Sequence, residues 1–152
     1  LRLGWVRAPQ SLRPSLVVAK QAADLHSSTI DQAAAAIYLD TGALDEHVTG
    51  LRRVYGQRRD AMLARLPSAL PAGATWTRPA GGMFVWVTLP GGRDAAADLP
   101  AALDGGVAFV PGAAFFAADP DPATLRLSFT THAPAVIEEG LGRLAGVLRS
   151  RS

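Results

Sequence analysis

The spacing of the apolar residues changes near Pro67, and this change limits the folds open to the chain. From about residue 11 to Pro67, apolar side chains recur every three or four residues, which is the period of an amphipathic helix. After it, prolines and glycines separate short apolar runs, a pattern typical of strands and turns. The sequence therefore predicts an α/β protein in which one strand and three helices are followed by a small sheet mixed with two further helices. The composition change makes Pro67 a candidate domain boundary.

Helical periodicity is present in five segments, with a capping signal at one of them. The expected segments are 11–25, 29–42, 45–66, 95–104 and a final helix that carries Ile137, Leu141, Leu144 and Leu148. Thr29 and Gln32 have the T-x-x-Q spacing of a capping box, in which side chains satisfy the free N–H groups of a helix start. Thr29 is therefore expected to cap the second helix.

Strand-like patterns are present at the start of the chain and again after Pro67. Leu1, Leu3 and Trp5 alternate with Arg2 and Gly4, which predicts a strand with one buried face. Further strands are expected at 74–78, 83–89, 107–110 and 124–129. The strands at 74–78 and 83–89 are close enough to form a hairpin.

The composition of the 152 residues excludes several kinds of chemistry. Because the sequence has no cysteine, it can form no disulfide, no thiolate metal site and no cysteine nucleophile. The three histidines are scattered without metal-ligand spacing, which argues against a metal site. No apolar run approaches the ~20 residues of a membrane-spanning helix. We expect a soluble, cytoplasmic protein.

Arg2 and Arg126 are the main candidate site residues. Each lies inside an apolar strand pattern, and a buried arginine needs an anion or a partner. A guanidinium group binds carboxylate or phosphate through two parallel hydrogen bonds. The alternative is a strand whose polar face is solvated.

Two further features have more than one interpretation. The arginine pairs 52–53 and 58–59 form either a basic stripe for nucleic acid or a solvated helix face. The segments 79–82 and 110–112 contain glycines that allow either a close backbone approach to a ligand or another strand, or simply tight turns.

Five segments in order resemble one family. They are Leu1-Arg2-Leu3-Gly4-Trp5, the stretch from Lys20-Gln21 to His26-Ser27, the stretch from Tyr55 to Asp60, the stretch from Pro79 to Pro90, and Val107 to Gly112 with Phe115-Phe116 and Leu125-Arg126-Leu127-Ser128-Phe129. Together they resemble the C-terminal part of a fold-type I pyridoxal-phosphate aminotransferase. The resemblance is to the class I/II group that includes 2-aminoadipate, kynurenine and aromatic aminotransferases.

The resemblance implies roles for both arginines. Arg2 matches the arginine that contacts the cofactor phosphate, and Arg126 matches the arginine that binds the substrate α-carboxylate. Gly81-Gly82 and Val110-Pro111-Gly112 are expected to line the cleft with backbone. The implied fold is the C-terminal part of the aspartate aminotransferase-like fold, with a small α+β domain whose short, mainly antiparallel sheet is covered by helices.

The resemblance also implies that the chain is a fragment. In such enzymes the Schiff-base lysine lies a few residues before the Arg2 motif, a position that precedes Leu1. Lys20 matches a helical Lys-Gln pair instead, and we interpret it as a surface residue. Residues 1–50 are then the tail of the large domain and residues 51–152 the small domain. The fragment alone is expected to be inactive.

Three functions remain open for the parent protein. The first is a homodimeric aminotransferase that exchanges an amino group between an amino acid and a 2-oxo acid. The second is a regulator in which this domain follows a winged-helix DNA-binding domain; nucleic acid is expected as a partner only in that case. The third is a folding or dimerisation module without a ligand. The run Met83-Phe84-Val85-Trp86 resembles the metabolic enzymes more closely, which favours the first.

Overall fold

The computed structural model describes residues 1–150, and the chain divides into two compact units. The N-terminal unit is Leu1–Gly50, and the C-terminal unit begins at Leu51. The division falls within helix α3 (Leu44–Ala69), not at the composition change near Pro67. Among the described residues, no helix has the length and apolarity needed to cross a membrane.

The N-terminal unit contains helices α1 (Arg13–Ala23) and α2 (Thr29–Asp40) and the first turns of α3. None of its residues is buried. The strand expected at Leu1–Trp5 is absent from this unit, so that prediction is wrong. A strand requires a hydrogen-bonded neighbour, and no described strand pairs with this segment. Arg2 also has a φ of 59°, which lies in the left-handed region and is incompatible with a strand.

Helix α2 begins one residue earlier than the capping box predicted. The Ser28 hydroxyl accepts a hydrogen bond from the Asp31 N–H at 3.3 Å, so Ser28 is the capping residue and not Thr29. The Gln32 N–H donates to the Ser28 carbonyl at 3.1 Å, which makes Ser28 the acceptor of the first helical bond. Because Ser28 and Thr29 both have a hydroxyl group, the sequence is compatible with either of them as the capping residue.

The C-terminal unit contains a four-stranded antiparallel sheet in the order β1-β2-β4-β3. Its strands are β1 (Thr75–Trp76), β2 (Phe84–Thr88), β3 (Val110–Pro111) and β4 (Thr124–Ser128). The short β3 starts three residues later than expected, because the Val107 N–H donates to the Ala102 carbonyl as the chain leaves helix α4. Pro111 is compatible with the sheet because β3 is an edge strand.

The other elements of this unit are helices α3, α4 (Ala95–Asp104) and α5 (Pro134–Ser150) and the 3₁₀ turn η1 (Gly112–Phe115). Helix α3 extends three residues past the expected end at Leu66, although Pro67 lies in its last turn. The Leu70 N–H donates to the Leu66 carbonyl at 3.0 Å, so helical bonding continues after the proline. Burial of Leu66 and Ala69 in the core stabilises this last turn.

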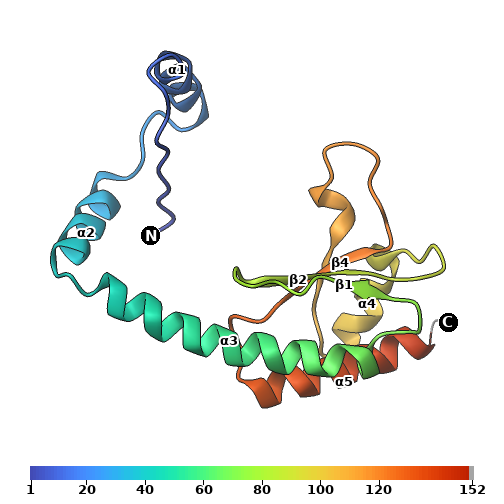
Figure 1. Cartoon of the computed structure of the whole chain (residues 1–152). Helices are drawn as coiled ribbons and strands as arrows, with labels where there is room; N and C mark the ends of the chain where they lie inside the picture. The colour runs from blue at the N-terminus through green and yellow to red at the C-terminus, as the bar shows by residue number, and fades with distance from the viewer. Residues whose placement is uncertain (151–152) are drawn as a thin grey trace. The chain divides into compact units, whose positions relative to one another are not determined.

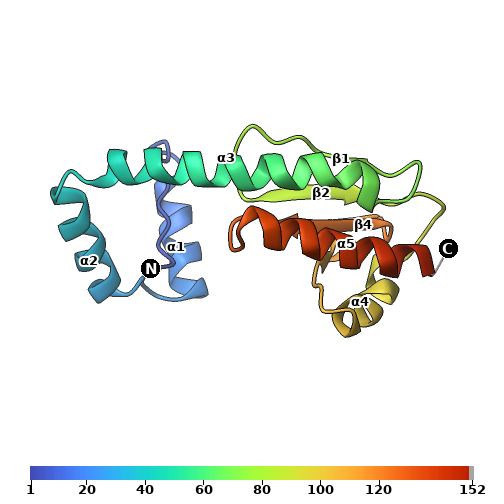
Figure 2. The same cartoon turned by 90° about the horizontal axis from the view of Figure 1, so that it is seen from below.

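The hydrophobic core lies between the sheet and helices α3 and α5, which run side by side across one face of the sheet (Figures 1 and 2). Inward positions of β2 and β4, including Val85, Val87 and Leu125, have no exposed surface. Because side chains alternate along a strand, the positions between them point to the opposite face. Arg126 and Trp86 are therefore on the face of the sheet that the two helices leave uncovered.

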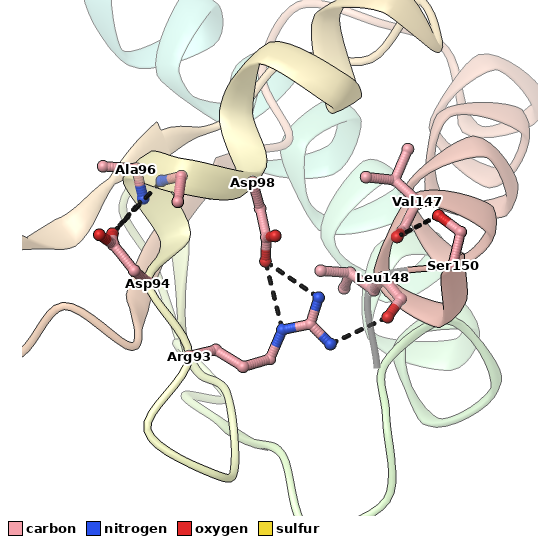
Figure 3. Close-up of polar contacts among 8 residues, drawn as sticks. Arg93, Asp94, Ala96, Asp98, Val147, Leu148 and Ser150 are labelled. Carbon is pink, nitrogen blue, oxygen red and sulfur yellow. Dashed lines mark hydrogen bonds and ion pairs between the residues drawn. The ribbon is translucent and has the colours of Figure 1, made fainter.

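A largely buried ion pair joins the start of α4 to the end of α5 (Figure 3). The Arg93 guanidinium donates through Nε and Nη2 to one carboxylate oxygen of Asp98, at 3.2 and 3.1 Å. Its Nη1 donates to the Leu148 carbonyl in the last turn of α5, at 2.9 Å. One arginine therefore stabilises the packing of two helices.

The N-terminus of α4 provides a first stability test. The Asp94 carboxylate accepts hydrogen bonds from the N–H groups of Ala96 and Ala97, at 2.8 and 3.3 Å. We expect Asp94→Ala to lower the free energy of unfolding by about 1 kcal/mol, because it removes this cap. Asp94→Asn keeps a capping oxygen and should lose much less. Urea denaturation of the full-length protein measures both, and equal losses would show that capping is not the cause.

Candidate anion-binding site

Arg126 lies at the centre of the sheet, and both neighbouring strands fix its position. It is the third residue of β4 and pairs with Trp86 of β2 on one side and with Val110 of β3 on the other. The residue is half-buried, whereas its neighbours Leu125 and Leu127 are buried in the core. The side chain therefore emerges from the middle of the uncovered face, with aromatic residues around it.

Two aromatic rings contact the Arg126 guanidinium. Its central carbon lies 4.0 Å from the ring centroid of Phe84 and 4.6 Å from that of Phe115. Both distances are within the range of cation–π attraction. Among residues 1–150, no side chain or backbone oxygen forms a hydrogen bond or ion pair with this guanidinium. Its planar set of N–H donors remains available for an anion.

The turn after β3 packs closely on the same face. The Trp86 ring lies 5.8 Å from the Phe115 ring in an edge-on arrangement and 6.1 Å from the Phe116 ring. Gly112 allows this approach, because a Cβ atom there would lie 2.8 Å from the Trp86 ring and 2.2 Å from the Thr124 hydroxyl. Gly112 thus has a packing role beside the site, because it allows the backbone of segment 110–112 to approach side chains of β2 and β4 closely. This agrees with a close approach to another strand.

Two arginines of α3 stabilise the loops at the ends of the central strands. Arg58 donates to the Thr130 carbonyl, just after β4. Arg59 donates to the carbonyls of Pro79 and Ala80, before β2, at 3.3 and 3.4 Å. Neither interpretation of the arginine pairs anticipated these roles. The signal was not available from the sequence, because the Arg58 contact joins residues 72 positions apart.

The loop before β2 contains one glycine in a left-handed conformation. Gly82 has a φ of 82°, which other residues rarely adopt, whereas the φ of Gly81 is not positive. The Phe129 N–H donates to the Met83 carbonyl at 3.2 Å, next to the first pair of the β2–β4 ladder. The glycine therefore forms a tight turn whose exit is fixed to the end of β4.

Arg2 and Lys20 belong to the N-terminal unit. Arg2 is exposed, and in the described part of the chain nothing donates to, accepts from or pairs with its side chain. Such a guanidinium fits a phosphate group, which accepts hydrogen bonds from two of its donors at once. Lys20 is exposed on α1 and forms an ion pair with Asp24 one turn away. This placement agrees with its interpretation as a surface residue.

Metal ligands are not clustered in the described part of the chain. Residues 1–150 contain no group of three or more histidine, aspartate or glutamate side chains that could hold a metal ion. The candidate ligand chemistry of these residues rests instead on Arg2 and Arg126, whose guanidinium groups recognise anions.

The sheet, the two covering helices and the arginine on the uncovered face define a small α/β domain with a candidate anion-binding site. Residues 1–144 match the family model described as aminotransferase class I and II. The chain belongs to this family. The resemblance found in the sequence and the predicted fold class are confirmed.

Named relatives match the chain over nearly its whole length. It is 44% identical over 148 residues to Aromatic-amino-acid aminotransferase 1 of Thermococcus litoralis, covering 97% of this chain and 36% of that protein. It is also similar to the crystal structure of LysN, the alpha-aminoadipate aminotransferase of Thermus thermophilus, complexed with N-(5'-phosphopyridoxyl)-L-leucine. That match has a TM-score of 0.83 and 41% identity, and it covers 95% of this chain and 37% of the other. The chain thus spans little more than a third of each.

A shorter match links the chain to a different class of protein. The uncharacterized HTH-type transcriptional regulator YisV of Bacillus subtilis is 41% identical over 88 residues, which covers 58% of this chain and 18% of the regulator. A segment similar to more than half of this chain therefore also occurs in a protein named as a regulator.

Proposed function

We propose that the chain is the C-terminal part of an aminotransferase that transfers an amino group between an amino acid and a 2-oxo acid. The observation that carries this proposal is Arg126, a guanidinium on an uncovered sheet face with its N–H donors available. Both kinds of substrate have a carboxylate, for which this donor pattern is the best match among side chains.

The cofactor is pyridoxal phosphate, which when bound supplies the electron sink for amino-group transfer. Arg2 binds its phosphate group through the exposed guanidinium, which has no competing partner among the described residues. Arg126 binds the substrate carboxylate and so orients the amino or keto carbon toward the cofactor. The Schiff-base lysine belongs to the part of the enzyme before Leu1, so the fragment alone is inactive.

The parent enzyme is a cytoplasmic homodimer in this proposal. The N-terminal unit is the tail of the large domain, and residues 51–152 form the small domain. The exposed apolar side chains of the N-terminal unit support its assignment to a larger domain, since none of its residues is buried within the chain itself.

A charge-conserving substitution tests the role of Arg126. Arg126→Lys in the full-length enzyme keeps the positive charge but replaces two parallel hydrogen bonds by a single point of contact. We expect KM for the amino acid and for the 2-oxo acid to rise roughly 10- to 100-fold, the effect of weakening one charged hydrogen-bonding contact. Steady-state kinetics of both half-reactions measures this.

Arg143→Lys is the matched control for this experiment. Arg143 is an exposed arginine of α5 that pairs with Glu139 one turn away at 2.6 Å. Its replacement should leave both KM values unchanged. If Arg126→Lys also leaves both KM values unchanged, Arg126 does not bind the substrate and the proposed function loses its main support.

A pyridoxal-phosphate-dependent regulator with a winged-helix DNA-binding domain is the second candidate. The match to YisV supports it, but that match covers 58% of the chain, whereas the match to the Thermococcus litoralis enzyme covers 97%. The two candidates differ in the sequence before Leu1. A large catalytic domain alone would favour the enzyme, and an additional basic helix-turn-helix segment would favour the regulator.

A further inference from the structure

We propose that Phe84 and Phe115 are positioning residues that hold the Arg126 guanidinium ready for the substrate carboxylate. This inference rests on the proposed function of Arg126 as the carboxylate ligand. It assigns to the two rings an effect on substrate affinity that acts through the arginine.

The two rings come from different elements and meet at Arg126. Phe84 is the first residue of β2, two positions before Trp86, the direct strand partner of Arg126. Residues two positions apart on a strand point to the same face, so Phe84 is a diagonal neighbour of Arg126. Phe115 ends the 3₁₀ turn η1 and reaches the guanidinium from outside the sheet.

The way Arg126 is held differs from that of other arginines of the same unit. Arg58 and Arg59 donate to backbone carbonyls, and Arg93 and Arg143 donate to carboxylates. In each of these cases the contacts occupy N–H donors. Arg126 instead contacts two ring faces, and no oxygen among the described residues accepts from it.

A ring face holds an arginine without occupying its donors. The attraction is between the positive charge and the electron-rich face of the ring, so the N–H groups at the edge of the guanidinium stay available. A carboxylate in the same place would neutralise the charge and compete with the substrate for the same donors. Restraining the long side chain in advance also lowers the entropy lost on binding.

This arrangement predicts a common effect on both substrates. The amino acid and the 2-oxo acid carry the same carboxylate, so loosening Arg126 should weaken both to a similar degree. A ring that touched the substrate side chain directly would instead affect substrates according to their side chains.

The test uses Phe84→Leu and Phe115→Leu in the full-length enzyme, because leucine is apolar but has no aromatic face. We expect each variant to raise KM for both substrates roughly three- to tenfold, the effect expected from loss of one cation–π contact, with little change in kcat. Phe115→Tyr keeps an aromatic ring, so its KM values should stay within about twofold of those of the unmodified enzyme, because the cation–π contact is retained.

Phe116→Leu is the matched control, because the Phe116 ring packs on Trp86 rather than on Arg126. If Phe84→Leu does not fold, Phe115→Leu remains informative, since that side chain is about half exposed.

A double-mutant cycle separates this inference from the proposed function. In an Arg126→Ala background the cation is absent, so Phe84→Leu and Phe115→Leu should cause no further rise in KM. An undiminished effect in that background would mean that the rings act on the substrate directly, and the inference would be wrong. It would also be wrong if Arg126→Lys raised KM while neither leucine variant did. If Arg126→Lys itself left KM unchanged, the proposed role of Arg126 as the carboxylate ligand would be wrong, and the inference that depends on it would be wrong as well.

Discussion

Asp98→Ala should lower the free energy of unfolding by about 3–5 kcal/mol, the effect of breaking a buried ion pair from one side. The Asp98 side chain is 7% exposed and that of Arg93 is 14% exposed, so water replaces little of the lost interaction. Arg93 is also fixed to the Leu148 carbonyl of α5 and cannot easily turn toward solvent. The substitution leaves its charge in place without the carboxylate that faces it.

Asp104→Ala is the control for this prediction. Asp104 is exposed at the C-terminal end of the same helix, where a negative charge is slightly unfavourable. Its removal should change the free energy of unfolding by less than about 0.5 kcal/mol. Urea denaturation of the full-length protein, followed by far-UV circular dichroism, compares the two variants. Similar small losses would mean that the Arg93–Asp98 pair does not stabilise the fold.

Gly112→Ala is expected to lower the free energy of unfolding by about 3 kcal/mol, at the upper end of the range for overpacked positions. The new Cβ atom would lie 2.7 Å from Thr124 Cβ and 2.8 Å from the Trp86 ring, well inside contact distance. Thr124 is 2% exposed, and its hydroxyl donates to the Asp121 carbonyl at 2.7 Å, so it has little freedom to move. Either β4 or the turn η1 must therefore shift.

The same change at Gly146 provides the comparison for this prediction. Gly146 is an exposed residue of α5 where an added Cβ atom meets nothing within 4 Å. Gly146→Ala should stabilise the protein by about 0.5–1 kcal/mol, because alanine favours the helix interior. Thermal or urea unfolding distinguishes the opposite signs. A neutral Gly112→Ala would show that the turn relaxes easily and that the close approach to Trp86 is not required.

Much of the C-terminal unit could be predicted from the sequence because its core is local to the unit. The apolar periodicity indicated helix α4 at its observed bounds, and the alternation in 83–89 and 124–129 placed the central strands within one residue at each end. These patterns are reliable where the chain supplies both sides of the buried interface, as the sheet and α5 do here.

Two strand predictions were wrong or too long because a missing neighbouring strand or a contact outside the segment determines the structure there. Leu1, Leu3 and Trp5 alternate as a strand does, but alternation does not supply a hydrogen-bonded neighbour, and these residues are exposed. The expected strand at 107–110 is shortened by the Val107 hydrogen bond to Ala102, a helix-exit contact that the apolar run does not reveal.

The candidate site was predictable in part. Arg126 stood out because a charge inside an apolar strand needs an explanation, and the same strand pattern placed it on the face opposite Leu125. The sequence did not predict the aromatic rings around its guanidinium. Phe84 and Phe115 are distant in sequence and belong to a different strand and a turn, so only the fold brings them to the guanidinium.

The two-sided pairing of Arg126 has a consequence for strand alignment. A shift of β4 by one residue against β2 would turn Leu125 or Leu127 outward and drive the guanidinium of Arg126 among the buried side chains of α3 and α5. Burying that charge without an anion costs far more free energy than the hydrogen bonds between misaligned strands could contribute. The residue proposed to recognise the substrate therefore also disfavours a misaligned sheet, so one side chain serves both the proposed binding role and the correct strand register.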